Sequence, residues 1–177
     1  MNLEARFSTV CHKSDAIEIA HLMYNEPTLI QECVDLIVAN NKKYSHRASW
    51  ALNTLVEQYE SPNLQAYVPA LVASFVRADT LPAILRNLLH IFRVLEFSEE
   101  QEGLILDRCI KLLEDPKTAV AIQCMSMETI YRISSGNEFL LAELEALIMA
   151  HLEHGSGAYK ASSKKYLKLI QQNKKAS

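Results

Sequence analysis

A pair of histidines near the C-terminal end has the spacing best suited to holding a metal ion. His151 and His154 are three positions apart, and residues at this spacing lie on one face of a helix. The sequence offers no clear third ligand beside them, although protein metal sites need several ligands. Histidine is also favoured near a helix C-terminus, where it interacts with the helix dipole. We therefore interpret the pair as solvent-exposed and predict neither a metal site nor a cofactor.

Familiar catalytic motifs are missing from the sequence. It contains no G-x-S-x-G motif, no Walker loop, no dinucleotide-binding glycine fingerprint and no H-E-x-x-H. The tripeptide Gly155-Ser156-Gly157 precedes a predicted helix and could bind an anion through its amides, although a plain flexible turn is the simpler interpretation. We predict no catalytic residues and infer that the protein is not an enzyme.

The cysteines and the apolar runs indicate the compartment. The four cysteines occur singly, without the C-x-x-C pairs of a structural zinc site: Cys11, Cys33, Cys109 and Cys124. No signal peptide is evident at the N-terminus, and no apolar run reaches the roughly 18 residues of a membrane span. We therefore expect a cytoplasmic protein with reduced core thiols and no contact with a membrane.

An apolar stripe recurs along the chain at nearly constant spacing. Its members form pairs at helical spacing, namely Leu52 with Leu55, Leu89 with Phe92, Met127 with Ile130, and Tyr166 with Leu169. Successive pairs are 37, 38 and 39 residues apart, and both members of each pair shift together. A period near 38 with two helices in each period is typical of a helical repeat array, and an irregular helical bundle is the alternative.

The helix signals divide the chain into repeats. Only four Gly and five Pro interrupt a sequence dominated by helix formers, which predicts an all-α protein. The helix-start signals are Ser61-Pro62, the capping box from Ser98 to Gln101, Asp115-Pro116, and Gly136-Asn137. One domain, residues 1–177, is expected to contain an N-terminal helical cap, four helix pairs and a frayed tail, at 1–25, 26–60, 61–97, 98–136, 137–172 and 173–177.

Three short motifs resemble those of HEAT-like α-solenoid proteins. They are Arg47-Ala48-Ser49-Trp50-Ala51, Arg86-Asn87-Leu88-Leu89, and Ala121-Ile122-Gln123-Cys124-Met125-Ser126-Met127. More narrowly, they resemble a group of short bacterial HEAT-like proteins, some of which are labelled adenylosuccinate lyases. The sequence does not support that label, because it lacks the Gly-Ser-Ser-x-Met-Pro-x-Lys-x-Asn loop of those lyases. The resemblance implies a HEAT-like α-solenoid fold, and a fold alone does not fix an activity.

The position equivalent to Ala51 in the last repeat is Lys165. A charged residue there predicts that the final helix is a terminal cap with one side in water. We therefore expect Tyr166, beside it, to contribute less to the core than Leu52 does.

Charge differs between the first and second helices of the predicted pairs. The first helices sum to −11 and the second helices to +7, although the whole chain carries only −3. The resemblance implies that second helices line a concave surface, so this surface is expected to be neutral to basic. The residues projected onto or beside it, and predicted to bind a partner, are Trp50, Asn53, Arg86, Asn87, His90, Arg93, Glu128, Arg132, Lys160 and Lys164.

Two functions are compatible with these residues. The first is a non-enzymatic scaffold that binds a protein or peptide on the concave face, with Trp50 either anchoring the partner or filling the seam between repeats. The second is nucleic-acid binding in a basic groove, as in HEAT-like DNA glycosylases. The net charge of −3 lacks the basic footprint of DNA-binding proteins, and the groove carries one tryptophan and no supported catalytic acid. We favour the scaffold.

Overall fold

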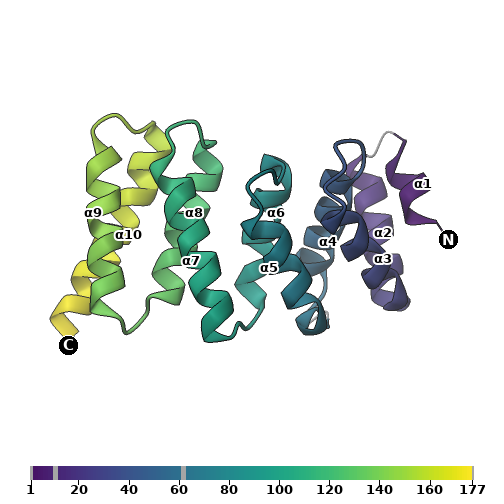
Figure 1. Ribbon diagram of the computed structural model, residues 1–177, viewed down its shortest axis with the longest axis horizontal. Coiled ribbons are helices and arrows are strands. Elements are labelled where there is room, and N and C mark those ends of the chain that lie inside the picture. The colour runs from purple at the N-terminus through teal and green to yellow at the C-terminus, as the bar shows by residue number, and fades with distance from the viewer. Residues whose placement is uncertain (1, 10–11, 61–62, 177) are drawn as a thin grey trace. The chain divides into compact units, whose positions relative to one another are not determined.

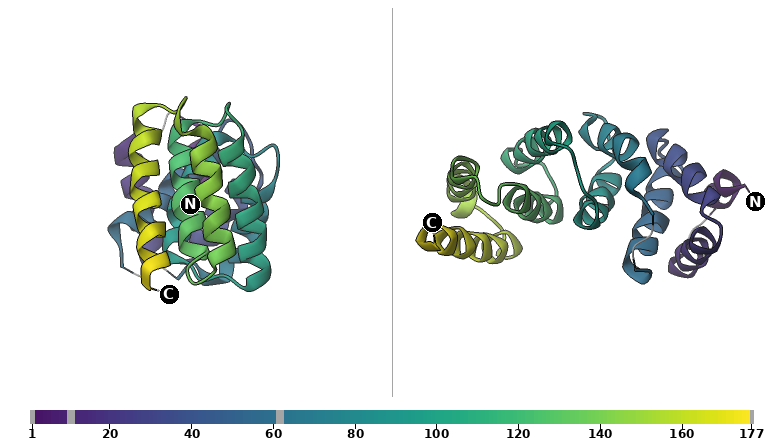
Figure 2. Two further views of the ribbon diagram at one scale, coloured as in Figure 1. Left: turned by 90° about the vertical axis from the view of Figure 1, so that its left-hand side faces the viewer. Right: turned by 90° about the horizontal axis from the view of Figure 1, so that it is seen from below.

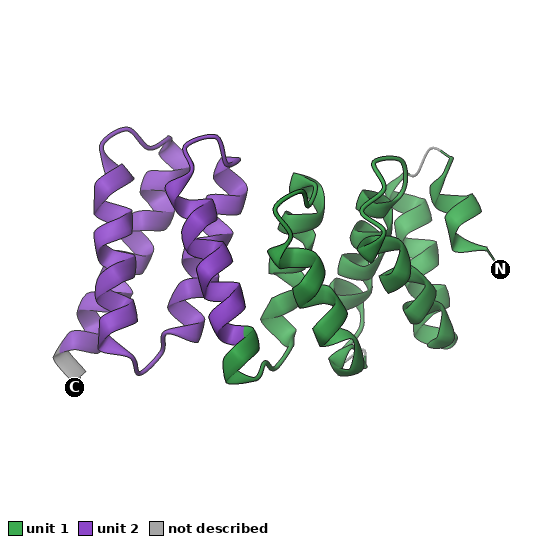
Figure 3. Ribbon diagram, viewed as in Figure 1, with its two compact units in different colours: residues 1–101 green, residues 102–177 purple. Residues whose placement is uncertain are grey.

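The computed structural model describes residues 2–9, 12–60 and 63–176, and this part of the chain is helical, with no strand (Figure 1). The predicted fold class, an all-α protein of stacked helix pairs, is confirmed. The chain separates into two compact units, residues 1–101 and 102–177 (Figure 3). We describe each unit by itself, and the assignment of residues 1–177 to one domain stays a prediction.

Unit 1 is built from two layers of helices. Its elements are α1 Leu3–Phe7, α2 Lys13–Asn25, α3 Thr28–Val38, α4 Ser45–Gln58, the short 3-10 helix η1 Gln65–Tyr67, α5 Val68–Val76, α6 Pro82–Ile91 and the 3-10 helix η2 Phe92–Val94. Helices α2, α4 and α6 stack side by side in one layer, and α1, α3 and α5 form the other (Figure 2). Helix α2 therefore holds the place that α4 and α6 hold further along, and α1 and α2 act as a shortened pair.

Unit 2 is also built from helices. It contains most of α7 Glu99–Glu114, followed by α8 Val120–Ile133, α9 Glu138–Leu152 and α10 Gly157–Ala176. Helices α8 and α10 pack side by side, and α9 packs against both. Helices α9 and α10 thus form one end of this unit (Figures 1 and 2).

Two of the predicted helix starts are confirmed at atomic detail. The Ser98 N–H donates to Gln101 Oε1 at 3.0 Å and the Gln101 N–H donates to Ser98 Oγ at 3.3 Å, which is the reciprocal capping box. Asn137 accepts from the Leu140 N–H at 3.2 Å. Gly136 before it has φ of 84°, a left-handed conformation that glycine adopts without strain.

The predicted start at Ser61-Pro62 lies outside the described residues, and the next helical residue that the structure describes is Gln65. The helix predicted from Asp115-Pro116 begins later than predicted. After Asp115, the backbone N–H of Lys117 donates to the Asp115 carboxylate at 2.9 Å and the Thr118 N–H to its carbonyl at 3.0 Å. This turn satisfies the local amides without a helix, so α8 starts at Val120.

The predicted stripe lies in the core except at its last member, Leu169, which is half-buried. Leu52, Leu89 and Met127 are at most 1 % exposed. In the last helix Lys165 is exposed as predicted, but Tyr166 is only 3 % exposed. The expectation of a weaker contribution from Tyr166 is therefore revised, because the ring packs inward beside Tyr131, with 5.6 Å between ring centroids.

Truncation of this stripe is expected to destabilise the protein at every repeat. Leu52→Ala, Leu89→Ala, Met127→Ala and Tyr166→Ala should each lower the free energy of unfolding by about 2–5 kcal/mol in urea titrations, because each empties a core site. Leu104 is 45 % exposed on α7, so the control Leu104→Ala should change the free energy of unfolding by about 0.5 kcal/mol or less. If Leu104→Ala lowered the free energy of unfolding as much as the core substitutions do, the described packing would be contradicted.

Substitution of two glycines by alanine should change the stability of the protein in opposite directions. Gly136→Ala forces an alanine into a left-handed conformation and should cost about 1–2 kcal/mol. Gly103 lies within α7, and a Cβ there would meet no atom within 4 Å. Gly103→Ala should therefore stabilise the protein by about 0.5–1 kcal/mol through its helix propensity. Calorimetry of both variants tests this, and equal shifts of the melting temperature would refute it.

Candidate partner-binding surface

The motif from Arg47 to Ala51 allows α4 to pack closely against its neighbours. Ala48 and Ala51 are fully buried, and their small side chains permit the close approach of other helices. Arg47 lies at the start of the helix and reaches back to the turn after α1, where Nη1 donates to the carbonyl of Phe7 at 2.5 Å and to that of Thr9. The motif thus fixes α4 within unit 1 and ties the first helices to it.

A chain of polar side chains crosses the seam between α4 and α6. In its buried part, Asn87 Nδ2 donates to Ser49 Oγ at 2.9 Å. Nearer the solvent, His90 Nδ1 lies 2.6 Å from Asn53 Oδ1, while Asn53 Nδ2 donates to Glu57 Oε1 at 2.9 Å. This pattern requires the His90 tautomer with a proton on Nδ1. Asn53 therefore bonds within α4 through its amide nitrogen and reaches α6 through its amide oxygen.

These contacts define the roles of the predicted residues in unit 1. Asn53 and Asn87 are only 8 % and 5 % exposed, so they hold the seam and have little surface to offer a partner. His90 and Trp50 are half-buried, and Arg86 and Arg93 are exposed. The structure brings Asn53 and His90 together, whereas Asn87 contacts Ser49, which the helical projection did not select.

The predicted residues of unit 2 lie on the layer formed by α8 and α10. Glu128 and Arg132 on α8 are half-buried, and Lys160 and Lys164 on α10 are exposed. Lys165 and Lys168 are exposed on the same helix. Lys174, by contrast, pairs with Glu145 of α9 at 2.5 Å. The assignment of all these residues to one partner-binding surface stays a prediction.

A second seam, between α2 and α4, carries residues that the sequence did not single out. Tyr59 stacks on Tyr24, with ring centroids 4.2 Å apart, and its hydroxyl lies 2.9 Å from His21 Nδ1. Tyr24 is 52 % exposed, so the aromatic pair reaches the surface. Tyr59 follows His21 by 38 positions, one repeat length. A search for the repeat length among the polar residues, and not only among the apolar ones, would have detected this pair.

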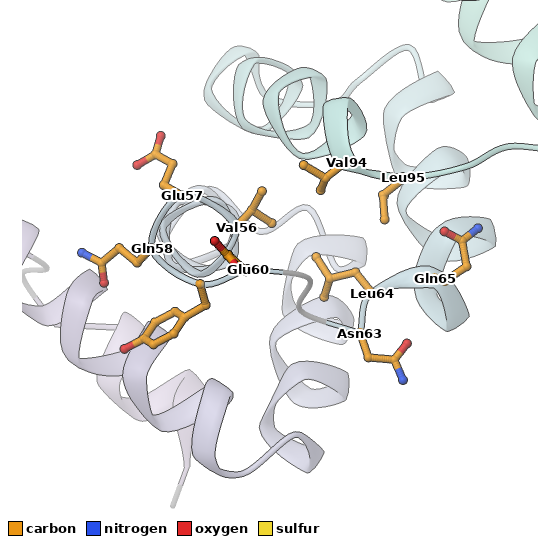
Figure 4. Close-up of a pocket in the computed structure, with 10 residues that line it drawn as sticks. Val56, Glu57, Gln58, Glu60, Asn63, Leu64, Gln65, Val94 and Leu95 are labelled. Carbon is orange, nitrogen blue, oxygen red and sulfur yellow. The ribbon is translucent and has the colours of Figure 1, made fainter.

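An open pocket of about 700 Å³ lies next to Tyr59, where α4 ends. Figure 4 shows Val56 on one side of the space and Val94 and Leu95 on the other. Its lining residues are Val56, Glu57, Gln58, Tyr59, Glu60, Asn63, Leu64, Gln65, Val94 and Leu95. They include two carboxylates and no lysine or arginine. The pocket therefore combines apolar walls with a negative charge.

Two of the described cysteines carry buried thiols of low reactivity. Cys33 and Cys109 are buried, and burial raises the pKa of the Cys109 thiol to about 12 and that of Cys33 well above its ordinary value. Both stay protonated at neutral pH and are poor nucleophiles. Cys124 is half-buried, and Cys11 lies outside the described residues. Among those residues no group of three His, Cys, Asp or Glu is placed to hold a metal.

The comparisons with known proteins agree with this architecture. The chain matches the family model of the HEAT repeat domain over residues 3–170, and it belongs to the HEAT repeat family. HEAT repeats commonly mediate protein interactions, and the family is typically a non-catalytic scaffold. Searches of curated proteins and of solved structures found no match. No helix in the described part of the chain is long and apolar enough to cross a membrane.

The buried seam can be tested by a double-mutant cycle on Ser49 and Asn87. Ser49→Ala leaves the buried Asn87 amide without this partner, which should cost about 1–3 kcal/mol of unfolding free energy. Asn87→Ala leaves Ser49 Oγ still donating to the His46 carbonyl at 2.8 Å, so its loss should lie at the lower end of that range. The double variant removes both groups, so its loss should be smaller than the sum of the single losses by at least about 0.5 kcal/mol. Strict additivity in urea titrations would show that the two side chains do not interact.

Proposed function

We propose that this chain is a non-enzymatic interaction protein that binds a protein or peptide segment on the layer formed by α2, α4 and α6. The observation that carries the proposal is the pocket at the end of α4, with Tyr24 and Tyr59 beside it. Exposed aromatic side chains next to a pocket are typical of the anchoring points in protein interfaces. Membership of the HEAT repeat family supports the same class of function.

The lining of the pocket indicates which side chain it would accept. Val56, Leu64 and Val94 provide apolar walls, and Glu57 and Glu60 provide negative charge. Lysine and arginine combine an apolar stem with a cationic end, so they match both properties. A phosphate would meet two carboxylates and no cation. The preferred ligand is therefore a peptide segment with a lysine or arginine next to aliphatic residues.

A specific observation favours nucleic acid as the second candidate. The exposed lysines of α10 in unit 2 offer a cationic surface, formed by Lys160, Lys164, Lys165 and Lys168. Such a surface would bind a phosphate backbone with steep salt dependence, because binding releases counterions. The exposed position of these lysines is equally typical of a solubilising helix at the end of an array.

Selection from a random peptide library against the purified protein tests the first candidate. The recovered peptides should be enriched in lysine or arginine beside aliphatic residues. Glu60→Gln and Val94→Ala should each weaken binding of the best labelled peptide by about tenfold, because both residues line the pocket. Val38→Ala is the matched control, since Val38 is 37 % exposed but belongs to α3 in the other layer. Acidic peptides, or peptides insensitive to both variants, would refute the proposal.

The second candidate is tested with labelled single-stranded and duplex oligonucleotides at two salt concentrations. We expect no tight binding to either. The outcome that would replace the peptide proposal is salt-sensitive binding that persists in Trp50→Ala but disappears when Lys160, Lys164 and Lys168 are changed to alanine. These lysines are exposed, so the triple variant should melt close to the wild-type temperature.

A further inference from the structure

Helix α9 has an apolar face that no part of unit 2 covers. Leu141, Leu144 and Ile148 are buried against the rest of the unit. On the other side of the helix Phe139 is 90 % exposed and Met149 is 56 % exposed. A single exposed apolar residue is ordinary, whereas a contiguous exposed apolar patch marks an interaction site.

The exposed apolar residues of α9 form one continuous stripe. At 100° per residue, Phe139 and Met149 fall on the same side of the helix, and the exposed alanines at 142, 146 and 150 lie between and beside them. Small residues between two large ones allow the close approach of another helix. We name Phe139, Met149 and these three alanines the α9 stripe.

Acidic residues border the α9 stripe on both sides. Glu138 lies at one edge and Glu143 at the other, and both are exposed. The helix contains no lysine or arginine. Its remaining acid, Glu145, is already paired with Lys174 of α10. The border of the stripe is therefore negative, and opposite charges on a partner would complement it.

A pocket adjoins one edge of the α9 stripe. It measures about 510 Å³ and lies between the start of α9 and the end of α10, with Leu141, Asn173 and Lys174 among its lining residues. Glu138 and Ala142 line the pocket and also belong to the exposed side of α9. A side chain of a helix lying on the stripe can therefore enter the pocket and anchor the complex.

We propose that the α9 stripe and its adjoining pocket bind an amphipathic helix of a partner protein, with an apolar face flanked by lysine or arginine. This surface lies in unit 2 and is independent of the pocket at the end of α4. A second copy of this chain is a poorer occupant, because α9 against α9 would bring acidic borders together. An anionic membrane surface would likewise repel Glu138 and Glu143.

The probe is a labelled synthetic helix of about 18 residues, long enough to cover the 15 residues of α9. It carries a leucine and alanine stripe with lysines on both borders. Two matched peptides carry glutamates on the borders or the same residues in scrambled order. Fluorescence anisotropy with the full chain should show binding of the lysine-bordered peptide, and binding weaker by about tenfold or more for the other two.

Three variants test the surface, and two further variants serve as controls. Phe139→Ala and Met149→Ala should each weaken binding of the lysine-bordered peptide by about tenfold, and both side chains are exposed enough to leave the fold intact. Glu138→Gln with Glu143→Gln should weaken it by about threefold or more and reduce its salt dependence. Leu104→Ala on α7 is the matched control and should bind as the wild type does. Val94→Ala should also have no effect, which separates this surface from the α4 pocket.

Several outcomes would overturn the proposal. One is equal binding of the three peptides, and another is wild-type affinity in both Phe139→Ala and Met149→Ala. Analytical ultracentrifugation that shows a dimer dissociated by Phe139→Ala would assign the stripe to a second copy. Binding to phosphatidylserine-containing vesicles that Phe139→Ala abolishes would assign it to a membrane.

Discussion

The close packing of α4 between α2 and α6 is the constraint on which unit 1 depends. The fully buried Ala48 and Ala51 leave room for neighbouring helices, and a larger side chain at either position would force those helices apart. On one side Tyr59 contacts His21, and on the other Asn53 contacts His90, at separations of 38 and 37 positions. The polar contacts thus repeat with the period of the core, and the two sets of interactions position the same helices.

This repetition explains what could be predicted from the sequence. The apolar stripe predicted the repeat length because Leu52 and Leu89 occupy equivalent core positions and must recur together. The capping box at Ser98 and the cap at Asn137 predicted their helix boundaries because each satisfies backbone groups locally. The later start of α8 was missed, since the competing turn at Asp115 uses the same kind of side-chain acceptor as a helix cap.

The candidate surface was harder to predict for a related reason. A helical projection assigns polar residues to solvent, whereas Asn53 and Asn87 are polar residues buried between helices. Their burial depends on partners one repeat away, and a single helix carries no information about them. The pocket beside Tyr59 is built from the end of α4, the segment after it and the end of η2, which meet only in the folded unit. The exposed apolar face of α9 was missed because the spacing of apolar residues along a helix does not show which of its two apolar faces is buried.

The repeat-length spacing of these contacts also affects how the chain can fold during synthesis. The bond between Asn53 and His90 spans 37 positions, and that between Tyr131 and Asn173 spans 42. Partners one repeat apart emerge from the ribosome one soon after the other, and the seam of α2 with α4 can form before α6 has emerged. Closing such short segments costs little chain entropy, so assembly can proceed in step with translation from one repeat to the next. Newly made helices of unit 1 therefore spend only a short time with their apolar stripes exposed.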